Sequence, residues 1–295
     1  MSVAVKVPGA CGELVQGVID GTPFLVTCPI NMWSTATAFI KPNEAGTVLQ
    51  EKAAYALQKL CAQLSIDKKN ITIGLSTQLL KSKGMSSSSA DIAAVCKAAA
   101  LSQKKILTEA QTARLAAGIE PTDGVFCRGI VKFNHITGEI LAYLGDPPPL
   151  KILVFDCGGK VDTVVFNQRG ELPHLNEQKQ CQVKKALALV EYGIKNKDVE
   201  AIGEGATISA VANQSILYKE DLADIIEIVK AYKGQGVNVA HSGTLIGAIF
   251  TAQENIEVLY GCIKAIKERC PYTKYLFATE LVSGGFFDNM GKRIN

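Results

Sequence analysis

Three consecutive prolines, Pro147–Pro149, interrupt the chain near its middle, in the string GDPPPL. Proline lacks a backbone N–H and has a fixed φ angle, so three in a row cannot continue a helix or a central strand. The string KILVFDCGG, which follows, is typical of a buried strand that ends in a turn. We therefore predict two domains, residues 1–148 and residues 149–295, with the boundary at this proline cluster.

Strand-like and helix-like runs do not alternate regularly along the chain. In the first half, the β-prone runs are residues 3–7, 24–30, 34–40 and 71–76, and the runs with helical spacing of apolar residues are 53–64, 89–101 and 109–119. In the second half, the helical runs are 183–196, 198–214, 221–233 and 256–270; the strand-like runs are 237–243, with 245–252 as its continuation, and 273–283. Mixed runs of this kind favour an α+β fold over an alternating parallel α/β fold.

Composition excludes several classes of protein. With 47% hydrophobic residues among 295, the chain can bury a large core, and we expect a soluble globular protein. The net charge is only +3 and basic residues form no blocks, which disfavours nucleic acid and membrane partners. The nine cysteines include no CxxC pair and indicate neither a zinc site nor a disulfide scaffold; most should be buried. Since the N-terminus has no sustained apolar run, we expect a cytoplasmic location.

A run of four serines, Ser86–Ser89, stands between a glycine and a helical pattern in the string KGMSSSSADIAA. The N-terminus of a helix has unpaired N–H groups and the positive end of the helix dipole, so this run could bind phosphate. Alternatively, Ser88 caps the helix and Asp91 completes a capping box. The apolar face of this helix is formed by Ile92, Val95, Cys96 and Ala99.

Two further segments carry groups suited to chemistry on a phosphate. In IEPTDG, Glu120 could bind a magnesium ion and Asp123 could accept a proton, although PTDG is also typical of a β-turn. In NVAHSGTLIGAIF, Ser242 and Thr244 could donate hydrogen bonds to an anion. His241, between them and the strand, is either a general base or a hydrogen-bonded structural residue.

Taken together and in this order, the segments resemble the GHMP kinase superfamily, which includes galactokinase and the homoserine, mevalonate and phosphomevalonate kinases. The resemblance is carried by a turn at Pro8–Gly9 and by the strings at residues 84–90, 120–123 and 242–244. Within the superfamily, the strings PGACGELVQG, KGMSSSSADIAA, IEPTDG, DCGGKVDTVVFN and AHSGT resemble the L-threonine kinases of bacterial cobalamin biosynthesis.

The resemblance implies a two-domain α+β fold, with an N-terminal β-rich domain (1–148) that binds ATP and is covered by helices, and a C-terminal ferredoxin-like domain (149–295). It implies transfer of the γ-phosphoryl group of MgATP to L-threonine, giving O-phospho-L-threonine for the aminopropanol phosphate linker of cobalamin. L-serine, L-homoserine or another small alcohol stays open as the acceptor, as does a non-catalytic nucleotide-binding regulatory protein. A homodimer is also left open.

The resemblance also implies site residues. Those implied for ATP are Lys83, Gly84, Met85, Ser86, Ser87, Ser88 and Ser89, with Ser88 and Glu120 for Mg²⁺. Asp123 is the implied catalytic residue, either as a base or as a group that positions the hydroxyl. Those implied for the small amino-acid substrate are Glu13, Gln16, Asp162, Thr163, Ser242 and Thr244, with Glu13 toward its amino group. Lys160 and Arg128 are candidates for its carboxylate.

Overall fold

The structure, a computed structural model, describes residues 2–39, 49–67, 69, 71–159, 161, 165–166 and 168–294. Its strands are β1 (Ser2–Ile19), β2 (Thr22–Phe39), β3 (Thr72–Thr77), β4 (Ile130–Asn134), β5 (Glu139–Gly145), β6 (Leu150–Asp156), β7 (Gly236–Val239), β8 (Leu245–Thr251), β9 (Lys274–Glu280), β10 (Phe286–Phe287) and β11 (Arg293–Ile294). Its helices are α1 (Glu51–Leu64), α2 (Ser87–Ser102), α3 (Glu109–Ala117), α5 (Leu172–Gln178), α6 (Gln180–Asn196), α7 (Val199–Ala212), the short 3₁₀ helix η2 (Asn213–Ser215), α8 (Leu222–Ala231) and α9 (Ile256–Arg269).

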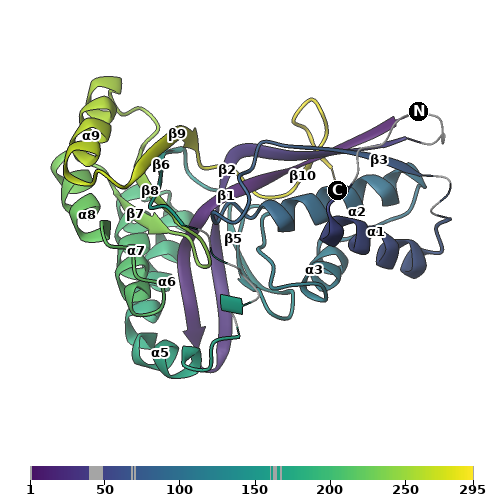
Figure 1. Ribbon diagram of the computed structural model, residues 1–295, viewed down its shortest axis with the longest axis horizontal. Coiled ribbons are helices and arrows are strands. Elements are labelled where there is room, and N and C mark those ends of the chain that lie inside the picture. Colours follow the sequence, from purple (N-terminus) through teal and green to yellow (C-terminus); the bar gives the residue numbers. More distant parts are fainter. Residues whose placement is uncertain are drawn as a thin grey trace.

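A long hairpin of β1 and β2 connects two groups of helices. Figure 1 shows it bent, with its turn beside α5 and its open end beside the layer of α1 and α2. The pairing of the two strands shifts register between Pro8 and Gly9 and again before and after Glu13. The predicted turn at Pro8–Gly9 is therefore wrong: these residues lie inside β1, where a bulge, not a chain reversal, accommodates them.

The second half of the chain forms a ferredoxin-like unit. Its four main strands lie in the order β7–β8–β6–β9, with all neighbours antiparallel and with α9 connecting β8 to β9. This order confirms the ferredoxin-like expectation and the α+β class. However, residues 245–252 do not continue the strand of 237–243, because Ala240 donates a hydrogen bond of 3.0 Å to the carbonyl of Leu245 and the chain reverses between β7 and β8.

Helix α2 is buried on nearly all sides, because β1 and β2 cover one side and α1 and α3 cover the other. Even Asp91 and Lys97 are buried, so the single apolar face that the sequence indicates is too narrow. Most cysteines, among them Cys11 and Cys96, lie in the core as predicted. No helix in the described part of the chain combines the length and the apolar character needed to cross a membrane.

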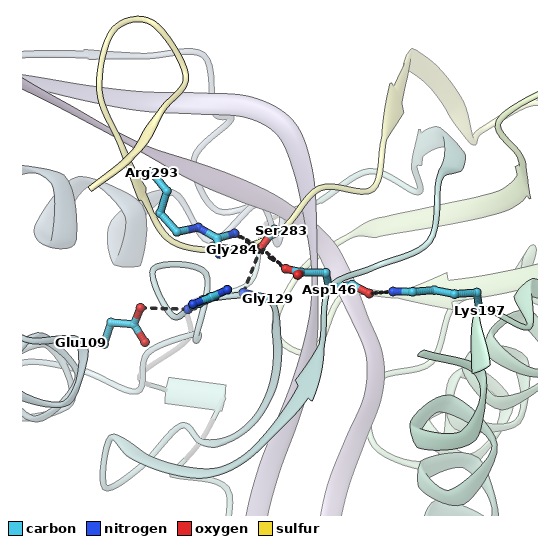
Figure 2. A network of polar contacts seen from close by, with 8 residues as sticks. Glu109, Gly129, Asp146, Lys197, Ser283, Gly284 and Arg293 are labelled. Atoms are coloured by element: carbon cyan, nitrogen blue, oxygen red, sulfur yellow. Dashed lines mark hydrogen bonds and ion pairs between the residues drawn. The ribbon is translucent and has the colours of Figure 1, made fainter. Parts of the chain in front are cut away.

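Residues from both sides of the prolines share one polar network (Figure 2). The Ser283 hydroxyl accepts hydrogen bonds from the backbone of Gly129 (2.9 Å) and from Arg293 Nη2 (2.6 Å). The carbonyl of Asp146 accepts a hydrogen bond from Lys197 Nζ, at the end of α6. The sheet and the larger hydrophobic core also continue across residue 148, so the division into two domains stays a prediction.

Candidate active site

The serine run is fixed in place by backbone hydrogen bonds to β1. The carbonyl of Met85 accepts one from Ala10 (3.0 Å), and the carbonyl of Gly84 accepts one from Gly12 (3.2 Å). Gly84 has a φ angle of +96°, and a Cβ atom there would lie 2.3 Å from the Cβ of Ala240. Only glycine allows this close approach, which explains the glycine before the serines.

The other side of the loop is tied to β8 and β6. The carbonyl of Lys83 accepts hydrogen bonds from the backbone N–H groups of Thr244 (2.9 Å) and Leu245 (3.2 Å). The Lys83 ammonium group lies 2.7 Å from the carboxylate of Asp156 and donates to the carbonyl of Gly159 (2.9 Å). Lys83 is therefore already paired in this structure, and its role in ATP binding stays a prediction.

Helix α2 begins at Ser87, so the serines do open a helix. Ser86, the residue before it, has left-handed backbone angles (φ 53°, ψ 29°), and its side chain does not cap the helix. Because the first N–H groups of a helix have no partner within it, they are available to an anion at this end. This arrangement is suited to binding a phosphate group.

The alternative capping box of Ser88 and Asp91 is wrong. The carboxylate of Asp91 instead accepts hydrogen bonds from Ser34 Oγ (2.5 Å) and Gln50 Nε2 (3.3 Å). Burial raises the pKa of Asp91, and these partners compensate for the lost hydration. Asp91 thus links the start of α2 to β2 instead of to its own helix.

Glu120 gathers the groups that a metal ion would need. Its buried carboxylate accepts a hydrogen bond from Ser88 Oγ with one oxygen and pairs with Lys52 Nζ through the other. A carboxylate that already holds a cation, next to a hydroxyl, fits Mg²⁺, which prefers oxygen ligands and commonly takes the rest from phosphate and water. Within the described residues, no group of three or more His, Cys, Asp or Glu side chains is placed to hold a metal ion.

Asp123 follows Glu120 in an irregular stretch, and the predicted β-turn over residues 121–124 does not form. Instead, the Ser89 hydroxyl accepts hydrogen bonds from the backbone N–H of Asp123 (3.0 Å) and from Thr122 Oγ1 (2.9 Å). Burial raises the pKa of the Asp123 carboxyl to about 6, and repulsion from Glu120 adds to this, whereas hydrogen bonds with Ser86 and Ser89 oppose it. A carboxyl group of this kind can exchange a proton near neutral pH.

Glu13 and Gln16 lie beneath this site, on β1. Burial and repulsion from Asp123 raise the pKa of Glu13 well above its usual range. Gln16 donates from Nε2 to the carbonyl of Val239 (3.2 Å), so its Oε1 faces His241 Nδ1 at 2.9 Å. These contacts assign the proton of His241 to Nδ1 and support its interpretation as a hydrogen-bonded structural residue.

One cleft of about 330 Å³ brings most of the predicted residues together. Its lining includes Gly84, Met85, Ser86–Ser89, Glu120, Asp123 and Ser242. Thr244 instead donates to Asp156 (2.5 Å) beside a neighbouring cavity, and Arg128 lines neither. Asp162, Thr163 and Lys160 lie outside the described residues.

Sequence reasoning missed Lys52 and His135, which also line the cleft. Lys52 is 68 residues from its partner Glu120, and no local pattern marks it. Asp156, which holds Lys83, is also new, although it begins the string DCGG that the resemblance had singled out.

Comparisons with known proteins agree with this geometry. Residues 49–129 match the model of the GHMP kinases N terminal domain. The chain is 30% identical over 252 residues to the L-threonine kinase of Salmonella typhimurium, covering 83% of this chain and 82% of that protein. It is 32% identical over 251 residues to the L-threonine kinase of Citrobacter freundii, covering 84% and 85%.

Solved structures show the same fold. Homoserine kinase from Cytophaga hutchinsonii superposes with a TM-score of 0.70 at 14% identity, over 97% of this chain and 96% of that one. MDDEF in complex with MVAPP, AMPPCP and magnesium superposes with a TM-score of 0.63 at 14% identity, over 98% and 100%. With the serine loop, the acidic stretch and the relatives in agreement, the chain belongs to the GHMP kinase family and is a small-molecule kinase.

Proposed function

We propose that this kinase transfers the γ-phosphoryl group of ATP to the side-chain hydroxyl of L-threonine, forming O-phospho-L-threonine for the aminopropanol phosphate linker of cobalamin. Its similarity to two L-threonine kinases supports this acceptor. The structural observation that carries the proposal is the contact between Ser88 and Glu120 next to Asp123, at the N-terminus of α2. Phosphoryl transfer needs a site for phosphate, a site for Mg²⁺ and a group that acts on the acceptor hydroxyl, all side by side.

The N-terminus of α2 would hold the triphosphate, through the N–H groups that Ser86 leaves uncapped. Ser88 and Glu120 would hold Mg²⁺, which supplies positive charge to the phosphate oxygens when it is bound. Lys52 now pairs with Glu120, and its half-exposed side chain is free to turn toward a phosphate group in the same cleft. ATP and Mg²⁺ are cytoplasmic reagents, so we place the kinase in the cytoplasm.

Asp123 would act on the acceptor. Its carboxylate accepts the hydrogen bond of the threonine hydroxyl and takes the proton as the bond from oxygen to the γ-phosphorus forms and the bond to the β-phosphate oxygen breaks. Ser89 keeps this residue in place by accepting a hydrogen bond from its backbone N–H, and Ser86 and Ser89 also form hydrogen bonds with its carboxylate. The pKa of about 6 keeps Asp123 ionised at neutral pH while leaving it basic enough to accept the proton.

An acceptor panel tests the proposal. Purified enzyme, ATP and Mg²⁺ are combined with L-threonine, L-serine, L-homoserine and simple alcohols, and ADP and the phosphorylated product are measured for each. We expect the highest kcat/KM with L-threonine. A clear preference for another acceptor, or ATP binding without turnover on any of them, would contradict the proposal.

L-homoserine is the second candidate, because a homoserine kinase shares the fold across nearly the whole chain. L-serine differs from threonine by one methyl group, which a pocket discriminates by roughly 10-fold to 200-fold. The panel must therefore compare kcat/KM values and not only detect activity.

A further inference from the structure

Two lysines near the active site are buried without an acidic partner. Lys179 and Lys219 are each only 5% exposed. Lys179 Nζ donates to Asn213 Oδ1 (2.9 Å), and Lys219 Nζ lies 3.5 Å from the carbonyl of Ala240, the limit of hydrogen-bond distance. Among the ion pairs of the described residues, none includes either lysine. A buried ammonium group without a counter-charge is costly, so its presence needs a reason.

Both lysines lie close enough to His241, a residue of the cleft wall, to act on it electrostatically. Ala240, the contact of Lys219, directly precedes His241, and His241 lines the cleft together with Asp123. Burial lowers the pKa of His241 well below its usual range, and the positive charges of His135, Lys179 and Lys219 lower it further. The charges of His135, Lys179 and Lys219 therefore all act at His241.

A second cavity lies next to the active-site cleft and has Lys219 in its wall. A cavity of about 360 Å³ is lined by Lys219 and by Gly243 and Thr244 from the loop after His241. This cavity and the main cleft share Val161 in their walls. The two cavities therefore adjoin at Val161, and a ligand bound in the main cleft near Val161 would lie next to the cavity that contains Lys219.

Both acidic and basic groups lie around His241 and Asp123. Glu13 and Asp123 repel each other, whereas Lys179 and Lys219 act as positive charges on His241. The cavity that contains Lys219 is also lined by Glu220 and Asp221, neither of which forms an ion pair with Lys219 among the described residues. An amino acid is a zwitterion, with an ammonium and a carboxylate group on one carbon atom. Such a molecule can satisfy both kinds of group at once, with its ammonium toward the acidic residues and its carboxylate toward the basic ones.

We propose that Lys219, with Lys179 behind it, provides the positive charge that binds the carboxylate of the acceptor amino acid. This inference rests on the proposed function, because it assumes an amino-acid acceptor. It also explains why the fold keeps two unpaired lysines: the counter-charge arrives with the substrate. Burial lowers the pKa of Lys219 to about 8 and that of Lys179 to about 7, so a bound carboxylate would favour their charged forms.

Replacement of Lys219 by methionine separates this role from a structural one. Methionine keeps the length of the side chain and removes the buried charge, so Lys219→Met should fold and unfold at a temperature no lower than wild type. The matched control is Lys264→Met on α9, since Lys264 is exposed and, among the ion pairs of the described residues, occurs only with Glu268.

The activity test compares L-threonine with (R)-1-amino-2-propanol, which has the same hydroxyl and ammonium groups but no carboxylate. In Lys219→Met we expect the KM for L-threonine to rise roughly 30-fold or more, the loss typical when one partner of a buried charge pair is removed. The KM for ATP and the kcat/KM for aminopropanol should stay as in wild type. Lys264→Met should change none of these values.

Three results would overturn the inference: an unchanged KM for L-threonine in Lys219→Met, an increase in the KM for ATP instead, or an equal loss with aminopropanol. If wild type instead prefers L-serine or L-homoserine, the threonine proposal fails while the inference stands. The same comparison then uses that amino acid and its counterpart without the carboxylate, ethanolamine or 3-amino-1-propanol, and the same shift in KM supports the role of Lys219.

Discussion

The hydroxyl of Ser89 accepts a hydrogen bond of 3.0 Å from the backbone N–H of Asp123, and so connects the serine loop to the acidic stretch 34 residues later. Neither residue needs to touch ATP for this contact to matter. It fixes the distance between the end of the helix that receives phosphate and the carboxylate that faces the acceptor. Ser89 therefore differs from the other three serines of the loop in that, among the hydrogen bonds of the described residues, it holds the backbone of Asp123.

Ser89→Ala should disturb Asp123 without disturbing nucleotide binding. The substitution leaves the N–H of Asp123 and the hydroxyl of Thr122 without their acceptor, which should lower the free energy of unfolding by about 1–3 kcal/mol. We expect kcat to fall while the KM for ATP is retained. Urea denaturation and steady-state kinetics check both; a rise in the KM for ATP alone would show that Ser89 serves the nucleotide.

Ser88→Ala should change the dependence on magnesium. Ser88 contacts Glu120 at the proposed metal site. If its hydroxyl interacts with the ion, an interaction of a hydroxyl with a charged group is worth about 1.5–3 kcal/mol, so its loss should raise the half-saturating Mg²⁺ concentration roughly 10-fold or more. Ser87→Ala is the matched control, because Ser87 lines the same cleft but forms no hydrogen bond with Glu120 among the contacts of the described residues. It should alter the KM for ATP and leave the Mg²⁺ dependence as in wild type. Equal Mg²⁺ curves for the two variants would remove Ser88 from the metal site.

Asp123 should set the acidic limit of activity. Its pKa is raised from 3.8 to about 6, so the carboxylate loses its charge as the pH falls through about 6, and kcat/KM should fall with it. In Asp123→Asn, turnover should drop by roughly 10²-fold to 10⁴-fold, and this acidic limit should disappear from the remaining activity. Rates measured between pH 5 and 9 provide the test. The assignment fails if the variant keeps the wild-type profile.

Lys83 and Asp156 should behave as a pair. Their charged groups are 2.7 Å apart and mostly buried, and Thr244 donates to the same carboxylate. In a double-mutant cycle of Lys83→Met and Asp156→Asn, we expect a coupling energy of about 0.5–3 kcal/mol in unfolding by urea. Lys81→Met replaces Lys83→Met in the control cycle and should be additive with Asp156→Asn. Additivity in both cycles, with a raised KM for ATP in Lys83→Met, would instead favour direct contact with phosphate.

Much of the fold could be predicted because its signals are local. The apolar spacing of residues 89–101 predicts a helix, and the structure has α2 there. The structure of residues 237–252 is harder to predict, because their composition is typical of a strand throughout. The chain reversal depends on the hydrogen bond between Ala240 and Leu245, which the composition of this run does not indicate. Pro8–Gly9 resembles a turn locally, yet pairing with β2 keeps it extended.

The residues of the candidate site likewise fall into two groups, those that short sequence strings indicate and those that only the folded structure reveals. Gly84, the serines, Glu120 and Asp123 could be proposed because they occur in short strings of known order. Lys52 and Lys219 could not, since an isolated lysine in a sequence is ordinarily a surface residue. Their significance depends on burial and on partners far along the chain, which only the folded structure provides.

The pairing of β1 determines when this strand can complete its folding during synthesis. Strand β1 leaves the ribosome before its partners: it contacts α6 and α7, pairs with β7 at Glu13 and Val239, and pairs with β10 at Lys6 and Phe287. These partners emerge only after most of the chain has been translated, so part of the apolar surface of β1 stays uncovered until then. Contacts over such long separations in sequence slow folding, and this uncovered apolar surface of β1 is where a chaperone would be needed most to prevent aggregation.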